Sequence, residues 1–214
     1  MAELVAVLDY GMGNLHSASK ALEKVADGQK ILVTSDLDQA LKADRLVFPG
    51  VGAIRDCMHE LHASALDQAV QAFAANGRPL LGICVGMQAM MTRSAENGGV
   101  DCLGLFPGTV EHFGERTSET GERLKVPHMG WNQVRQTGPH PMWAGIPDGA
   151  RFYFVHSYQV PPTLPEEQIA ARCDYGGEFV AAVAHENVFA VQFHPEKSAP
   201  HGITLLENFL RWRP

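Results

Sequence analysis

The first half of the chain alternates short apolar runs with longer amphipathic stretches. The runs at residues 4–8, 30–34 and 45–48 are rich in apolar side chains and predict buried strands. Residues 14–26 and 61–73 carry apolar side chains at helical spacing, and Asn76-Gly77 is placed to close the second helix. Such alternation with short connections predicts an α/β fold of flavodoxin-like type, with a mixed, largely parallel sheet and helices on both faces.

The second half of the chain is richer in short β-type runs separated by turn residues. These runs cover residues 108–113, 125–127, 151–155, 169–172, 179–184 and 189–193. A final amphipathic helix is predicted at residues 202–212. The polar stretch 114–123 and the proline-rich stretch 161–165 are too short for domain linkers. A single domain over residues 1–214 is therefore expected.

Composition and charge narrow the classes of partner. The 214 residues carry a net charge of −7, and their Lys and Arg residues are scattered, which disfavours binding to nucleic acid or anionic lipid. No basic leader opens the chain, and its longest apolar stretch, residues 80–91, is too short to span a bilayer. We therefore expect a cytoplasmic protein that does not associate with membranes.

The cysteines and histidines offer no recognisable metal motif. Cys57, Cys84, Cys102 and Cys173 form no CxxC pair, which suits a reducing compartment. The two histidines of His59-Glu60-Leu61-His62 are three positions apart, whereas the zinc motif HExxH needs four, so the segment is interpreted as a polar helix face. Neither a metal nor a cofactor is expected.

An apolar strand runs into Gly82-Ile83-Cys84-Val85-Gly86 and then into a helix. This order is typical of a nucleophile elbow with cysteine in place of serine. The flanking glycines permit a tight turn, and the helix N-terminus favours a thiolate at Cys84. A small buried hydrophobe is the competing interpretation of Cys84, and for the pentapeptide alone the two are about equal.

A second strand ends in His194-Pro195-Glu196. Residues two apart in an extended segment point the same way, so His194 and Glu196 can face one pocket as a base and the carboxylate that orients it. A loop histidine beside a surface glutamate is the favoured interpretation of an isolated HxE. The presence of the cysteine elbow reverses that preference.

Two glycine-containing turns follow predicted strands. In Pro49-Gly50-Val51-Gly52 the backbone can turn N–H groups into a cavity, where with the N–H of Val85 they would hold an oxyanion. A plain strand-ending turn is about as consistent with this segment. Gly11-Met12-Gly13 lacks the third glycine of a dinucleotide fingerprint, because His16 occupies that position, so no nicotinamide site is expected.

Taken together, these segments resemble class I (triad) glutamine amidotransferases, and within that class the glutaminase-subunit family of imidazole glycerol phosphate synthase. The similarity covers essentially the whole chain. It is carried by DYGMGNL at 9–15, PGVGA at 49–53, GICVGMQ at 82–88, PHMGWN at 127–132, YFVHSY at 153–158 and QFHPEKS at 192–198.

The resemblance implies a role for each matching residue. Cys84 would be the nucleophile, His194 the general acid and base, and Glu196 the residue that orients His194. Glutamine would bind in a pocket shared by Gly52 and four further residues, namely Gln88, His156, Ser157 and Tyr158. Strand packing is the competing interpretation of His156 and Tyr158.

The resemblance also implies a partner. Asn14, Trp131 and Lys197 match positions that face a (β/α)₈-barrel cyclase subunit, which would consume the ammonia in a heterodimer to make imidazole glycerol phosphate and an aminoimidazole carboxamide ribonucleotide in histidine biosynthesis. Three alternatives stay open: a class I glutaminase that serves another synthase, a related cysteine hydrolase, and a non-enzymatic scaffold of flavodoxin-like fold.

Overall fold

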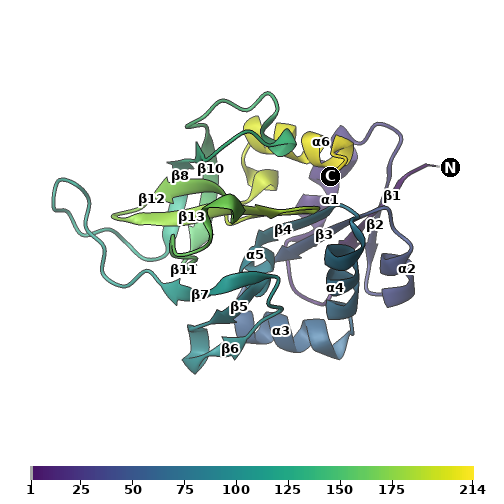
Figure 1. The fold of residues 1–214 in the computed structure, drawn as a ribbon, viewed down its shortest axis with the longest axis horizontal. Coiled ribbons are helices and arrows are strands. Elements are labelled where there is room, and N and C mark those ends of the chain that lie inside the picture. Colours follow the sequence, from purple (N-terminus) through teal and green to yellow (C-terminus); the bar gives the residue numbers. More distant parts are fainter. Residues whose placement is uncertain (1) are drawn as a thin grey trace.

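The computed structural model describes residues 2–214 and is built on an eight-stranded sheet (Figure 1). The strand order is β2-β1-β3-β4-β14-β13-β12-β9. The parallel strands are β2 (Lys30–Thr34), β1 (Leu4–Leu8), β3 (Arg45–Gly50), β4 (Leu80–Cys84) and β14 (Val188–Val191). The antiparallel strands are β13 (Glu178–His185), β12 (Ile169–Asp174) and β9 (Arg135–Gln136). The predicted mixed, largely parallel sheet is thus confirmed.

Helices cover both faces of this sheet. On one face α1 (Leu15–Val25) packs against α6 (His201–Arg211), while α3 (Ile54–Ala63) and α4 (Asp67–Asn76) lie on the other (Figure 1). Because both faces are covered, β3 and β4 are buried along their whole lengths, which explains why they are continuous apolar runs without alternation. No helix within residues 2–214 has the length and apolar character needed to cross a membrane.

The single helix predicted at residues 61–73 is wrong. The chain forms two helices, α3 and α4, because it turns between them at Ala65, whose φ is +58°. Leu61, Leu66 and Val70 are nevertheless all fully buried, so the apolar periodicity continues across the break and conceals it. A short helix before them, α2 (Leu37–Leu41), was not predicted.

The second half adds two small sheets beside the main one. The first pairs β10 (Arg151–His156) with β8 (His128–Gln133), and the second has the order β11-β7-β5-β6. Its strands are β11 (Tyr158–Gln159), β7 (Phe106–His112), β5 (Met91–Ser94) and β6 (Val100–Asp101). The strand predicted at residues 125–127 is wrong: pairing begins only at His128, since Pro127 has no N–H to donate.

Parallel pairing brings three strand ends to one edge of the main sheet. Gly50 on β3 is paired with Cys84 on β4, and Val191 on β14 is paired with Ile83 on β4. Since parallel strands end at the same edge, the turns after β3, β4 and β14 must lie side by side. The three segments that the sequence analysis singled out therefore meet at one place.

The turn after β4 has no room for a side chain at Gly86. A Cβ built there would collide with the carbonyl oxygen of Phe48 on β3, a backbone atom that cannot rotate away. We expect Gly86→Ala to lower the free energy of unfolding by about 2 kcal/mol or more, as overpacking does. Urea unfolding of the purified variant measures this.

Gly138→Ala is the matched control, because Gly138 is exposed and its Cβ would meet nothing within 4 Å. Equal unfolding midpoints for the two variants would contradict the close approach of Gly86 to β3.

Candidate active site

Cys84 stands at the turn from β4 into the short helix α5 (Val85–Ala89). Its φ of +55° and ψ of −111° are unusual for a residue with a side chain. Such a backbone persists only where the surroundings hold it, and it is frequent at catalytic sites. The predicted nucleophile elbow is thus present in the geometry, and the sulfur lies at the sheet edge where the strand ends meet.

His194 and Glu196 form a buried pair next to Cys84. Nδ1 of His194 lies 2.9 Å from Oε1 of Glu196, and the two side chains are 2% and 3% exposed. The extended segment from which this pairing was expected is wrong, because Pro195–Lys197 forms a 3₁₀ turn. The turn after Pro195 brings the carboxylate back to the imidazole.

The neighbours of His194 favour the protonated form of its imidazole. Burial by itself lowers the pKa of His194, but the Cys84 sulfur and the Glu196 carboxylate outweigh burial and raise that pKa to about 10. His194 is then an imidazolium at neutral pH, poised to give a proton away. With Nδ1 committed to Glu196, Nε2 has no hydrogen-bond partner among residues 2–214 and is free for a reacting group.

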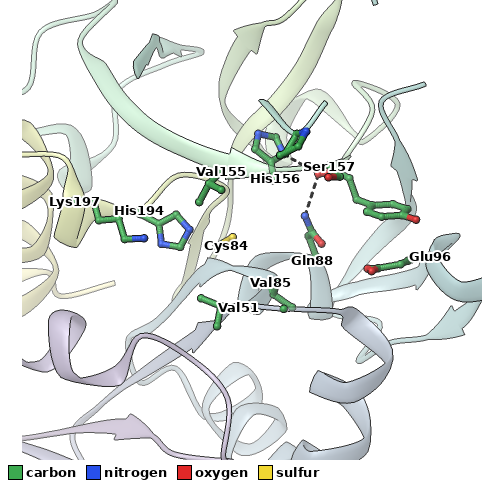
Figure 2. A pocket seen from close by; sticks show the side chains of 13 residues that line it. Val51, Cys84, Val85, Gln88, Glu96, Val155, His156, Ser157, His194 and Lys197 are labelled. Atoms are coloured by element: carbon green, nitrogen blue, oxygen red, sulfur yellow. Dashed lines mark hydrogen bonds between the residues drawn. The ribbon is translucent and has the colours of Figure 1, made fainter. Parts of the chain in front are cut away.

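A cavity of about 450 Å³ opens beside these groups (Figure 2). In this view the sulfur of Cys84 lies between His194 and Gln88, with Glu96 further along on the side of Gln88. The residues that line the cavity are Val51, Gly52, Cys84, Val85, Gln88, Glu96, Pro127, Val155, His156, Ser157, Tyr158, His194 and Lys197. Three separate sheets and several connecting turns therefore contribute to one chamber large enough for an amino acid.

Most of the residues predicted to bind substrate line this cavity. Gly50 does not: it is buried behind the cavity, where a Cβ would meet Gly86 N and the hydroxyl of Tyr10. Asn14 and Trp131 lie outside it, while Lys197 lines it and also places its Nζ 5.8 Å from the ring centre of Tyr153. Trp131 is on β8, 48% exposed, with its ring 6.2 Å from that of Tyr153.

Two residues at this site were missed by the sequence analysis. Glu96 lies in a 3₁₀ turn, Glu96–Gly98, and its Oε2 accepts a hydrogen bond from the N–H of Ile54 at 3.2 Å. No local pattern marks it, because its place depends on how β5 packs. Gln192 is fully buried with Nε2 3.7 Å from Sγ of Cys84. Gln192 lies two residues before His194 in the same run, and this spacing could have indicated that both side chains face Cys84.

A second buried pair, formed by His128 and His156, supports the cavity wall. Nδ1 of His156 donates to the carbonyl of Tyr158 at 2.7 Å, so its Nε2 must accept from Nδ1 of His128, 3.1 Å away. Burial lowers the pKa of His128 to about 4 and that of His156 to about 3. Both rings are therefore neutral at physiological pH, which the hydrogen-bond directions also require.

Comparison with known proteins agrees with this geometry. Residues 6–212 match the family described as "Glutamine amidotransferase class-I". "Imidazole glycerol phosphate synthase subunit HisH" of Pseudomonas putida is 59% identical over 210 residues, which is 98% of each chain. The subunit of the same name from Methylococcus capsulatus is 57% identical over 212 residues, covering 98% of this chain and 97% of the relative.

Solved structures share the fold at lower identity. A glutamine amidotransferase crystal structure superposes with a TM-score of 0.71 and 19% identity, covering 97% of both chains. The glutaminase domain of Trypanosoma brucei CTPS with bound acivicin gives a TM-score of 0.64 and 17% identity over the whole of this chain and 97% of that domain. At these identities the likeness concerns the fold alone.

The buried histidine pair predicts a loss of stability in mild acid. Between pH 6.5 and about 4 the unfolded chain takes up protons at His128 and His156 while the folded chain does not, so unfolding becomes easier as the pH falls. Each histidine costs up to about 1.4 kcal/mol per pH unit. We expect the urea midpoint to fall from pH 7 to pH 5, and to fall less in His128→Gln/His156→Gln.

His194 contributes equally to the parent and the variants: its raised pKa gives stability that is complete below pH 6.5 and is lost as the pH rises from 6.5 toward 10, so the difference in slope between proteins reports the buried pair. His59→Gln, at an exposed position of α3, is the control and should keep the slope of the parent protein. Identical slopes in all three proteins would show that the buried pair does not titrate as described.

Proposed function

The chain belongs to the glutamine amidotransferase class-I family and, within it, to the family of imidazole glycerol phosphate synthase subunit HisH, and on this basis we propose that its cavity hydrolyses glutamine. In this proposal Cys84 is the nucleophile, His194 the acid and base, and Glu196 the group that orients His194. One observation carries it: a cysteine in a strained strand-to-helix turn shares a cavity with a histidine whose other ring nitrogen is held by a buried glutamate.

The reaction follows from these positions. The Cys84 thiolate attacks the side-chain amide carbon, and backbone N–H groups of the Val51-Gly52 turn and of Val85 hold the oxyanion. As the C–N bond breaks, the His194 imidazolium protonates the leaving nitrogen, which departs as ammonia and leaves a glutamyl thioester. His194 then takes a proton from water, the resulting hydroxide attacks the thioester, and the C–S bond breaks to release glutamate.

Substrate recognition is assigned to the far end of the cavity. Among residues 2–214, Glu96 is the one acidic side chain that lines it, and Figure 2 shows Glu96 on the opposite side of Gln88 from His194. A carboxylate in that place suits the α-ammonium group of glutamine while the side-chain amide reaches Cys84. Ser157, His156 and Tyr158 complete the wall on the side of β10 and β11.

The ammonia is proposed to pass to a cyclase subunit, a (β/α)₈ barrel, in a heterodimer that works in the cytoplasm. Met129 and Trp131 on β8 are 62% and 48% exposed, which is unusual for large apolar side chains. The ring of Trp131 lies against Tyr153, and Nζ of Lys197 lies near that same tyrosine ring. We assign this surface, with Asn14, to the cyclase. The four cysteines are free, which suits a reducing compartment.

A single domain over residues 1–214 is part of the same proposal, since the family match spans residues 6–212. The rival synthases are weaker candidates. The GMP synthase subunit and PurLQS structures that share this fold are only 20% and 18% identical to the chain, whereas the HisH relatives reach 59%.

Cys84→Ser is expected to abolish glutamine-dependent synthesis in the assembled enzyme, while synthesis from added ammonium salt continues. The thiolate is needed only to release ammonia, so external ammonia bypasses it. Product formation by the variant–cyclase complex is measured with either nitrogen source. Cys102→Ser, at a partly exposed position away from the cavity, is the control. Loss of both activities in a correctly assembled Cys84 variant would count against the assignment.

Glu96→Gln is expected to raise KM for glutamine about tenfold or more and to change kcat much less. The substitution removes the charge that pairs with the ammonium group but leaves the sulfur, the imidazole and the oxyanion donors in place. Steady-state glutamate release measures both constants. Glu60→Gln, at an exposed site on α3, is the control. A variant with unchanged KM would remove Glu96 from the substrate site.

A further inference from the structure

Gln192 is a polar side chain in an apolar setting. It follows β14, whose residues Val188–Val191 are all buried, and it precedes the fully buried Phe193. Gln192 is itself 0% exposed. Burying an amide is costly unless both of its ends are hydrogen-bonded, so an apolar residue would fit this position more easily unless the amide has a task.

The strand register places Gln192 against the nucleophile. Val191 is paired with Ile83 in the parallel pair of β14 and β4, so the next positions along these strands, Gln192 and Cys84, are neighbours. Nε2 of Gln192 lies 3.7 Å from Sγ of Cys84, within hydrogen-bond reach of sulfur. Gln192 does not line the cavity, so it approaches the sulfur from the protein interior.

The orientation of this amide is determined by a chain of contacts that begins at the Tyr158 carbonyl. That oxygen accepts from Nδ1 of His156 at 2.7 Å and from Nε2 of Gln88 at 3.1 Å. Because a carbonyl cannot donate, the nitrogen of Gln88 must face it. The Tyr158–Gln88 contact is drawn as a dashed line in Figure 2.

The same nitrogen of Gln88 also donates to Oε1 of Gln192 at 2.9 Å. The oxygen of the Gln192 amide is thereby committed, and only its N–H group remains to face the sulfur. A flipped amide would set the oxygen of Gln192 against Sγ and two nitrogens against each other. The hydrogen bonds of Gln88 to the Tyr158 carbonyl and to Gln192 therefore fix the donor of Gln192 toward Cys84.

We propose that Gln192 is a positioning residue that donates its amide N–H to the Cys84 thiolate, stabilising the charged sulfur and aiming it into the cavity. A donor favours the charged form of its acceptor, and the effect is strong where water is excluded. Gln192 and His194 then flank one sulfur, the first holding its charge and the second exchanging a proton. This inference rests on the proposed function of Cys84 as the nucleophile.

The test is the pH dependence of Cys84 alkylation by iodoacetamide in the full chain, followed by mass spectrometry of the Cys84 peptide. In Gln192→Met the pH of half-maximal alkylation rate is expected to rise by about one unit, and kcat for glutamine to fall about tenfold or more, as losing a hydrogen bond to a charged group does. KM should change less than about threefold, because Gln192 does not line the cavity and Gln88, which does, keeps its hydrogen bond to the Tyr158 carbonyl.

Gln159→Met is the matched control, since Gln159 is also buried, at 3% exposed, and lies on β11, in a different sheet from Cys84. Gln192→Glu is the second variant, with an acceptor in place of the donor, and it should raise the alkylation midpoint further. Circular dichroism and thermal unfolding establish that each variant is folded before it is compared.

A folded Gln192→Met with the parental alkylation profile would overturn the proposal, as would an equal shift in Gln159→Met. Alkylation needs no glutamine, so its result is independent of whether the protein is a glutaminase. A shifted profile in a protein that releases no glutamate would leave Gln192 in place and refute the proposed function instead.

Discussion

The turn from β4 into α5 is the constraint on which the site depends. It needs a positive φ at Cys84 and an empty position at Gly86, because the backbone of β3 lies against the start of α5. This strained turn places the sulfur at the edge of the sheet where β3 and β14 also end. The turn after β3 and the His–Glu pair after β14 then reach it without long loops.

The Cys84 sulfur lies between a buried hydrogen-bond network and the cavity. Behind the sulfur, buried amides and imidazoles connect Gln192, Gln88 and the Tyr158 carbonyl to the neutral pair of His156 and His128. In a poorly solvated interior such a network is stable only when every member is satisfied, and so it imposes one orientation on each amide and ring. The cavity side carries the Val51-Gly52 turn, Glu96 and Nε2 of His194, which has no hydrogen-bond partner among residues 2–214.

Local patterns predicted the parallel strands of the main sheet within a few residues, because burial of a strand on both faces, as in β3 and β4, demands an apolar run. They did not predict β9, which is only two residues long. They failed at Ala65, where the core continues through a break in the helix, and at residues 125–127, where apolar character is not accompanied by pairing. The pairing of His194 with Glu196 was predicted for the wrong reason, since a turn rather than an extended segment brings them together.

By itself the sequence indicated the candidate catalytic residues of this protein and the order of its main strands and helices. The glycines around Cys84, the run that ends in His194 and Glu196, and the alternation of apolar runs with amphipathic helices are local, and each follows from the demands of a single turn, strand or helix. The tertiary structure decided which distant groups meet. Glu96 enters the cavity, Gln192 contacts the sulfur, and His128 supports His156 only because three sheets pack around one chamber. Such contacts depend on register and packing between segments far apart in the chain, which no local pattern encodes.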